Sequence, residues 1–188
     1  MHVAEKLTVL LAADGPRQNS AWTVFDRQLM DRVLADHNLP LYLAQFLPED
    51  RISEIEDTLA DIFGVHPPAQ TIVWQTAETL LKLAELGAVI LIGRGANIVT
   101  TKLPHVLHVR LVGPLDDRIE RICRDDHKTP AEARTFCLKE EAARARFLKT
   151  YFDAEINDPT RYHLVINKSR VGYVATARLI ADAVMRLP

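Results

Sequence analysis

Apolar positions in the first half of the chain follow two different spacings, one typical of helices and one typical of strands. Leu, Val, Ile and Ala recurring every three or four residues predict helices over 3–13 and 69–86. The short apolar runs 22–25 and 88–92 predict strands. Gly87 follows the second helix directly and is the residue type that most often ends a helix in the left-handed conformation. The second strand is almost continuously apolar, which predicts a central strand covered on both faces.

The second half of the chain repeats this alternation. The apolar runs 106–112 and 164–166 predict two more strands, and a helix over 115–125 follows the first of them. The pair Thr129-Pro130 predicts the start of another helix, and a final helix is expected from Val174. Strands that alternate with helices predict an α/β fold with a parallel sheet and helices as the crossover connections.

Two further segments are less regular. Asp26 is a favourable N-cap for a helix over 27–37. Residues 38–66 are rich in Leu, Ile, Asp and Glu, and we interpret them as a helical insertion in the form of a lid. Charged side chains crowd 139–153, so we interpret 126–160 as a second, lid-like segment that moves.

Composition narrows the classes of protein. With 188 residues and 48% hydrophobic content the chain is long enough for a full core, and we expect one domain over 1–188. A net charge of -2 argues against a general nucleic-acid binder or a membrane-surface protein. The two cysteines form no paired spacing that would indicate a disulfide framework or a zinc site. No apolar run is long enough for a membrane span and no signal peptide is evident, so we expect a cytoplasmic protein.

Arginines follow both central strands. Arg94 comes directly after the strand at 88–92, and Arg118 and Arg121 lie on the helix after the strand at 106–112. Open α/β sheets bind ligands at the carboxyl ends of their strands, and guanidinium groups there favour an anion, most readily a phosphate. The charged segment adds two more candidates, Arg144 and Arg146.

Each candidate also has a purely structural interpretation. Arg118 is placed to pair with Asp117 or Glu120 on its own helix. Asp26 is explained equally well as a helix N-cap or as a substrate ligand. The spacing His105-x-x-His108 suggests a metal site, but a strand would point these side chains to opposite faces, which favours a structural role.

The chain resembles the cytidylate-kinase-like family of P-loop nucleoside monophosphate kinases. The resemblance lies in five ordered stretches: a strand with a Gly-Arg loop at 89–97, the next strand over 103–111, an arginine-bearing helix at 114–121, a lid at 141–149, and a last strand with its loop at 162–170. It implies a three-layer kinase-like fold with helices on both faces of a parallel sheet. It also implies ATP-dependent phosphoryl transfer to a small acceptor such as CMP.

The resemblance assigns roles to residues. A catalytic clamp on the transferring group would come from Arg144 and Arg146, and Arg118 and Arg121 would contact the bound ATP. The acceptor nucleotide would contact Asp26, Arg27, Gly93, Arg94 and Asn97. ATP with Mg²⁺ is the implied cofactor, with the metal held mainly by the nucleotide and no protein metal site. The implied partner is a nucleotide substrate, neither nucleic acid nor membrane, and a homo-oligomer is compatible with the sequence.

The sequence departs from the family pattern at two places. The lid has Glu141 and Ala142 where the family pattern has an Asp and a basic residue. The glycine-rich loop that holds ATP phosphates is also missing, and 1–7 resembles the helix that follows that loop. We favour a missing first strand and loop over true loss, because their absence leaves neighbouring strand backbone unpaired.

These departures set the functional expectations. The chain as given is expected to be inactive or severely impaired, whereas an intact form would phosphorylate a small acceptor. The alternatives are a non-catalytic nucleotide-sensing or scaffolding domain and a kinase of another small metabolite.

Overall fold

The computed structural model of this chain describes residues 2–14, 21–26, 55, 57–62, 72–93 and 95–187. They form two compact units, one comprising 1–107 with 177–188 and the other 108–176. Each unit contains a two-stranded parallel sheet flanked by helices, so the α/β class with parallel strands is confirmed. A single domain over the whole chain stays a prediction.

The first unit begins with α1 (His2–Asp14), β1 (Thr23–Phe25), α5 (Ile72–Leu86), β2 (Val89–Leu91) and α6 (Ala96–Val99). Residues 57–62 are also helical. The predicted helices over 3–13 and 69–86 and the predicted strands over 22–25 and 88–92 are therefore confirmed. The expected helix at 27–37 and most of the expected insertion at 38–66 lie outside the described residues.

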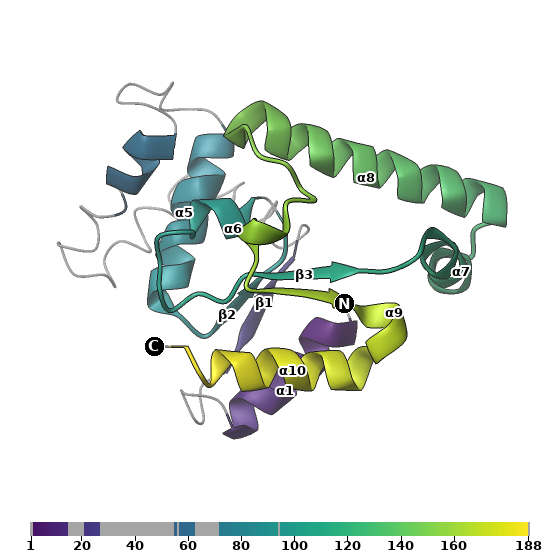
Figure 1. The fold of residues 1–188 in the computed structure, drawn as a ribbon, viewed down its shortest axis with the longest axis horizontal. Helices are drawn as coiled ribbons and strands as arrows, with labels where there is room; N and C mark the ends of the chain where they lie inside the picture. The colour runs from purple at the N-terminus through teal and green to yellow at the C-terminus, as the bar shows by residue number, and fades with distance from the viewer. Residues whose placement is uncertain are drawn as a thin grey trace. The chain divides into compact units, whose positions relative to one another are not determined.

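The core of the first unit comes from the apolar stripes of its helices. α1 contributes Val3, Leu7 and Leu11, which are buried at a spacing of four residues. α5 buries Leu80 and Leu81 and packs against β2 and α6, as Figure 1 shows. A further apolar group is buried at Ile55, Leu59 and Val99.

β1 and β2 pair in parallel, and their register sets what lies at the end of each strand. Phe25 is opposite Leu91, and the Ile92 amide donates to the Phe25 carbonyl at 2.9 Å. The segments that follow both strands therefore start from the same edge of the sheet. The three β2 residues are only half-buried and Ile92 is 40% exposed, so the predicted full cover of this strand is not seen. Among the described residues β2 has β1 as its single strand neighbour.

The second unit contains β3 (Val109–Val112), α7 (Leu115–Asp126), α8 (Pro130–Phe152), the 3-10 turn η1 (Pro159–Arg161), β4 (Leu164–Asn167) and α9 (Lys168–Val171). The last helix, α10 (Tyr173–Val184), begins here and continues into residues of the first unit. β3 and β4 run side by side in the same direction (Figure 1), with Val109 opposite Leu164 and Val112 opposite Asn167.

α7 and α8 form a helical hairpin that is held by one apolar cluster. Ile122, Ala133 and Cys137 are buried at its centre, with Ile119 and Cys123 packed against them. The connection is tight because His127 has a left-handed backbone and Thr129 starts α8 with a capping box to Glu132. Both cysteines are free thiols.

The lid-like segment differs from the expectation in one respect. The charged residues 139–153 are not set apart from the preceding helix, because α8 runs without interruption for 23 residues from Pro130 to Phe152 (Figure 1). Its sequence between those points is rich in Ala, Glu, Lys and Arg, all strong helix formers, and contains neither Gly nor Pro after position 130. The high helix propensity of these residues accounts for the uninterrupted helix.

Candidate functional site

The first candidate site is the sheet edge where β1 and β2 end, which we call the acceptor edge and define by Asp26, Gly93 and Asn97. Asp26 follows β1 directly and is half-buried. Gly93 and Gly95 follow β2 with φ angles of 83° and 75°, in the left-handed region that side chains disfavour. Nothing lies within 4 Å of a Cβ built on Gly93, so glycine is needed there for the backbone angle and not for space.

These two glycines turn the chain sharply into α6. The Ala96 amide donates to the Gly93 carbonyl at 3.1 Å, and the Gly95 carbonyl accepts from the Ile98 and Val99 amides. Asn97 follows in α6, and its Nδ2 is buried without a hydrogen-bond partner among the described residues. A buried amide donor of this kind is suited to a ligand oxygen. Arg27 and Arg94, also expected at this edge, lie outside the described residues.

The second candidate site is a small hollow in the second unit, at the carboxyl end of β3, which we call the β3 hollow. It is lined by Arg110, Leu111, Val112, Gly113, Arg118, Glu141 and Lys168. Its volume is about 110 Å³. Pockets that enclose a whole drug-sized ligand are larger, about 300–1,000 Å³. The hollow therefore fits only a small chemical group, and three basic side chains against one carboxylate favour an anionic one.

Arg118 is presented by the first turn of α7, where its own amide donates to the Pro114 carbonyl at 3.2 Å. Its Nη2 lies 3.1 Å from Oε2 of Glu141 on α8, and its Nε is buried without a partner among the described residues. The predicted pairing with Asp117 or Glu120 is replaced by this contact between two helices. Arg121, one turn further along α7, also has a buried Nε without a described partner.

The other two cations of the β3 hollow are held by neutral groups. Arg110 donates from Nη2 to Oδ1 of Asn157 at 2.7 Å and lies over the Tyr162 ring, 5.7 Å from its centroid. Lys168 begins α9, with its Nζ 5.4 Å from the centroid of the Tyr173 ring. Both side chains therefore keep their positive charge at the hollow.

The two arginines predicted to form the catalytic clamp are both exposed on α8. Two residues that are two positions apart on a helix are rotated by about 200° around its axis, so their side chains lie on nearly opposite faces. Arg144, three residues after Glu141, shares the face of α8 that carries Glu141, whereas Arg146 lies on nearly the opposite face. Of the pair, only Arg144 has the helical position from which to reach the β3 hollow.

Sequence reasoning identified Arg118 as a site residue and none of the other residues that line the hollow. Lys168 follows its strand just as Arg94 follows β2, so the rule of the carboxyl strand ends would have found it. Arg110 lies inside β3 and gives no such signal. Gly113 gives no such signal either, because its close approach to Ser169 of α9 depends on the folded structure.

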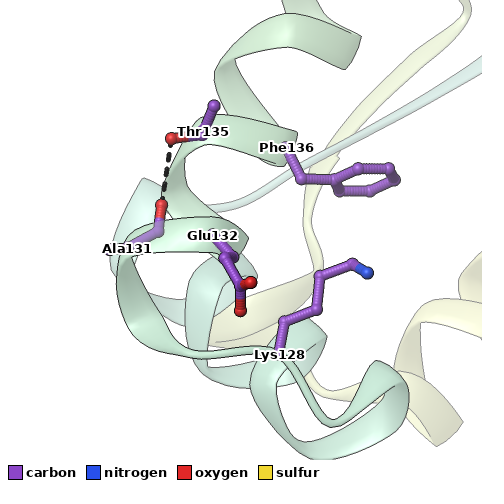
Figure 2. Close-up of a pocket in the computed structure, with 5 residues that line it drawn as sticks. All are labelled: Lys128, Ala131, Glu132, Thr135 and Phe136. Carbon is purple, nitrogen blue, oxygen red and sulfur yellow. Dashed lines mark hydrogen bonds between the residues drawn. The ribbon is translucent and has the colours of Figure 1, made fainter.

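A second depression lies at the start of α8 and is shown in Figure 2. It is lined by Lys128, Ala131, Glu132, Thr135 and Phe136, and the Thr135 hydroxyl donates to the Ala131 carbonyl at 3.0 Å. The carboxylate of Glu132 is engaged by the hydroxyl and amide of Thr129 in the capping box. This depression is explained by the start of the helix and provides no convergent free polar groups.

The two histidines that suggested a metal site have separate partners. Nε2 of His105 lies 3.4 Å from the Ala84 carbonyl oxygen. The ring of His108 stacks on His163 with 5.0 Å between centroids, and Nδ1 of His163 accepts from the His108 amide. Burial, reinforced by the neighbouring His163, lowers the pKa of His108 to about 4. His108 and His163 lie at the amino ends of β3 and β4, away from the β3 hollow.

Within the described ranges, no group of three or more His, Cys, Asp or Glu side chains is placed to hold a metal ion. None of the helices in the described part has the length and apolar content needed to cross a bilayer.

Comparison with known proteins agrees with the sequence resemblance. The model of the cytidylate kinase-like family matches residues 19–170. No curated protein matches the chain. A crystal structure of an uncharacterized protein from Eubacterium ventriosum is similar in fold, with a TM-score of 0.70 and 18% sequence identity over 97% of this chain and 89% of that chain.

Proposed function

Because the chain belongs to the cytidylate kinase-like family, we propose that it binds ATP through the β3 hollow and directs the terminal phosphate to a small acceptor, cytidine monophosphate. The observation that carries this proposal is the set of cations at the carboxyl end of β3, which includes Arg110, Arg118 and Lys168. Guanidinium and ammonium groups at such a strand end are suited to nucleotide phosphates.

Phosphoryl transfer requires positioning and charge neutralisation more than covalent chemistry by the protein. Arg118 would donate to a phosphate oxygen from Nη2 and from its unpartnered Nε. Lys168 would act as a second point charge, and Arg144 would approach from α8. Mg²⁺ would be held by the phosphate oxygens themselves and would screen their charge.

The acceptor would bind at the acceptor edge. There the Asn97 amide has a buried donor without a described partner, which suits an oxygen of the acceptor base or phosphate. Asp26 follows the paired strand and would accept from a hydroxyl or amino group of the same ligand. Arg27 and Arg94 are proposed to supply the charge for its phosphate.

The test of ATP binding is isothermal titration calorimetry on Arg118→Ala with Arg124→Ala as the matched control. Both arginines lie on α7, but Arg124 pairs with Asp125 at 3.2 Å and is not part of the β3 hollow. Loss of a charged hydrogen bond, about 1.5–3 kcal/mol, should weaken ATP binding at least tenfold in Arg118→Ala alone. Equal affinity in both variants, or no ATP binding by the wild type, would contradict the proposal.

A second function, nucleotide sensing without turnover, is favoured by one feature of the sequence. Its seven glycines stand at 15, 64, 87, 93, 95, 113 and 172, and none belongs to a glycine-rich phosphate loop that leads into a helix. Formation of ADP from ATP in the presence of cytidine monophosphate separates the two functions. Monophosphate binding without ADP formation supports the sensor, and ADP formation supports the kinase.

A further inference from the structure

We propose that Glu141 is a built-in competitor for the nucleotide: its carboxylate pairs with Arg118 in the β3 hollow and must leave before a phosphate group binds there. The inference rests on the proposed nucleotide-binding function and adds a regulatory contact to the same site. It starts from the 3.1 Å contact between Arg118 Nη2 and Glu141 Oε2. Both side chains line the hollow, so the carboxylate lies where an incoming anion would bind.

A carboxylate and a phosphate place oxygens at similar positions around a guanidinium group, so they compete for the same N–H donors. Glu141 is the single carboxylate among the residues that line the hollow. Arg110 is held instead by the neutral Asn157, and Lys168 lies over the Tyr173 ring. Of the three cations, therefore, Arg118 is the one whose charge is neutralised before a ligand arrives.

The ion pair between Arg118 and Glu141 should contribute little to the stability of the fold. The side chain of Arg118 is 24% exposed and that of Glu141 is 47% exposed, and ion pairs this open to water contribute little to folding. α7 and α8 are already held together by the buried cluster of Ile122, Ala133 and Cys137. Release of Glu141 should therefore leave the helical hairpin intact, as a competitor requires.

The experiment compares Glu141→Gln with wild type, using ATP and inorganic tripolyphosphate as separate calorimetric probes. The amide keeps the shape of the side chain and removes its charge, so both probes should bind about three- to tenfold more tightly. Glu120→Gln is the matched control because Glu120 is an exposed carboxylate on α7 that does not line the hollow. It should change the affinity less than twofold. An equal gain in both variants would show a general charge effect and would overturn the inference.

A second comparison isolates the role of Arg118. In an Arg118→Met background the change Glu141→Gln should no longer raise the affinity for tripolyphosphate, because the residue for which Glu141 competes is absent. A gain that persists at full size contradicts competition for Arg118. Unchanged or weaker binding by Glu141→Gln, in a protein whose wild type binds ATP, overturns the inference and leaves the proposed function standing.

Two further outcomes keep the proposals distinguishable. Absence of ATP binding in the wild type and in Glu141→Gln overturns the proposed function together with the inference. Detectable ATP binding by the wild type that tightens in Glu141→Gln supports both. Thermal unfolding supplies the structural check: the melting temperature of Glu141→Gln should stay close to that of the wild type, and a drop of roughly 5 °C or more, the shift that a loss of about 1 kcal/mol causes, would establish a structural role instead.

Discussion

Gly113 and Ser169 lie so close together that a Cβ at position 113 would be 2.8 Å from Ser169 Oγ. Gly113 follows β3 and Ser169 belongs to α9, which follows β4. The absence of a side chain at 113 therefore lets the two strand ends approach closely. Gly113 is one of the residues that line the β3 hollow.

Gly113→Ala is expected to destabilise the protein by about 1 kcal/mol, at the low end of the range for overpacking, because the Ser169 hydroxyl can rotate aside. Ser169→Ala removes the clashing oxygen, and the remaining Ser169 Cβ lies at an ordinary 3.8 Å. The double variant should therefore recover most of the loss. Urea denaturation of the two single variants and the double variant measures this recovery. Strictly additive losses in the free energy of unfolding would contradict the contact between Gly113 and Ser169.

Acid should destabilise the fold through His108, whose pKa is lowered to about 4 by burial and by the neighbouring His163. In the unfolded protein the His108 side chain binds a proton at its ordinary pKa of about 6.5. In the folded protein the same side chain is protonated only at lower pH. The unfolded state then binds more protons between these values, so the free energy of unfolding falls as pH drops from about 6.5 to about 4.

The measurement is urea denaturation of wild type and His108→Gln at pH 7 and pH 5. The free energy of unfolding should differ clearly less between pH 7 and pH 5 in the variant than in the wild type, whatever the stability of the variant at pH 7. His2→Gln is the control because His2 lies exposed in the first turn of α1. The His108 explanation fails if the pH dependence of His108→Gln matches that of the wild type.

Local patterns were sufficient to predict most elements of the fold. The stripe of Val3, Leu7 and Leu11 identified α1, and Gly87 marked the end of α5, where its φ of 73° is indeed left-handed. β3 proved shorter than predicted and begins at Val109. The His108 carbonyl already accepts the amides of His163 and Leu164, so the ladder starts there, and the Val106 amide turns back to Leu103.

The candidate site was less accessible to sequence reasoning because it depends on contacts between distant segments. Arg118 was found because it follows a strand, but its partner could not be, since Glu141 is 23 positions away and meets it only once α7 and α8 fold together. The side chain of Arg110 has a direction that depends on which face of β3 is covered. The relation of Arg144 to Glu141 needed the knowledge that α8 is one continuous helix.

The start of α8 provides a test of the helix that carries Glu141. The Thr129 hydroxyl accepts from the Glu132 amide, and the Glu132 carboxylate accepts from the Thr129 amide at 2.9 Å. Thr129→Ala removes this cap and should cost about 1 kcal/mol in the free energy of unfolding. Thr129→Ser keeps the hydroxyl and should stay near the wild type in the same urea titration. Similar losses in both variants would argue against the capping role.

Arg110 connects β3 to the segment between α8 and β4. Its Nη2 donates to Asn157 Oδ1 at 2.7 Å, while the Tyr162 hydroxyl, which donates to the Ile156 carbonyl at 3.0 Å, lies beside its Nη1. This clasp fixes the chain after the long helix α8 and keeps the Arg110 guanidinium beside the β3 hollow. A charged hydrogen bond near solvent should contribute about 1 kcal/mol to the free energy of unfolding.

A double-mutant cycle with Arg110→Met and Asn157→Ala tests the clasp. Methionine retains an apolar stem over the Tyr162 ring, so the cycle isolates the polar contact. Each single variant should lose about 1 kcal/mol, and the double variant should lose less than the sum by about 0.5–1 kcal/mol, because the two residues share one interaction. Arg124→Met, remote from Asn157 on exposed α7 surface, should change stability by less than about 0.5 kcal/mol. Strict additivity of Arg110→Met and Asn157→Ala would mean that the 2.7 Å contact does not hold the segment in solution.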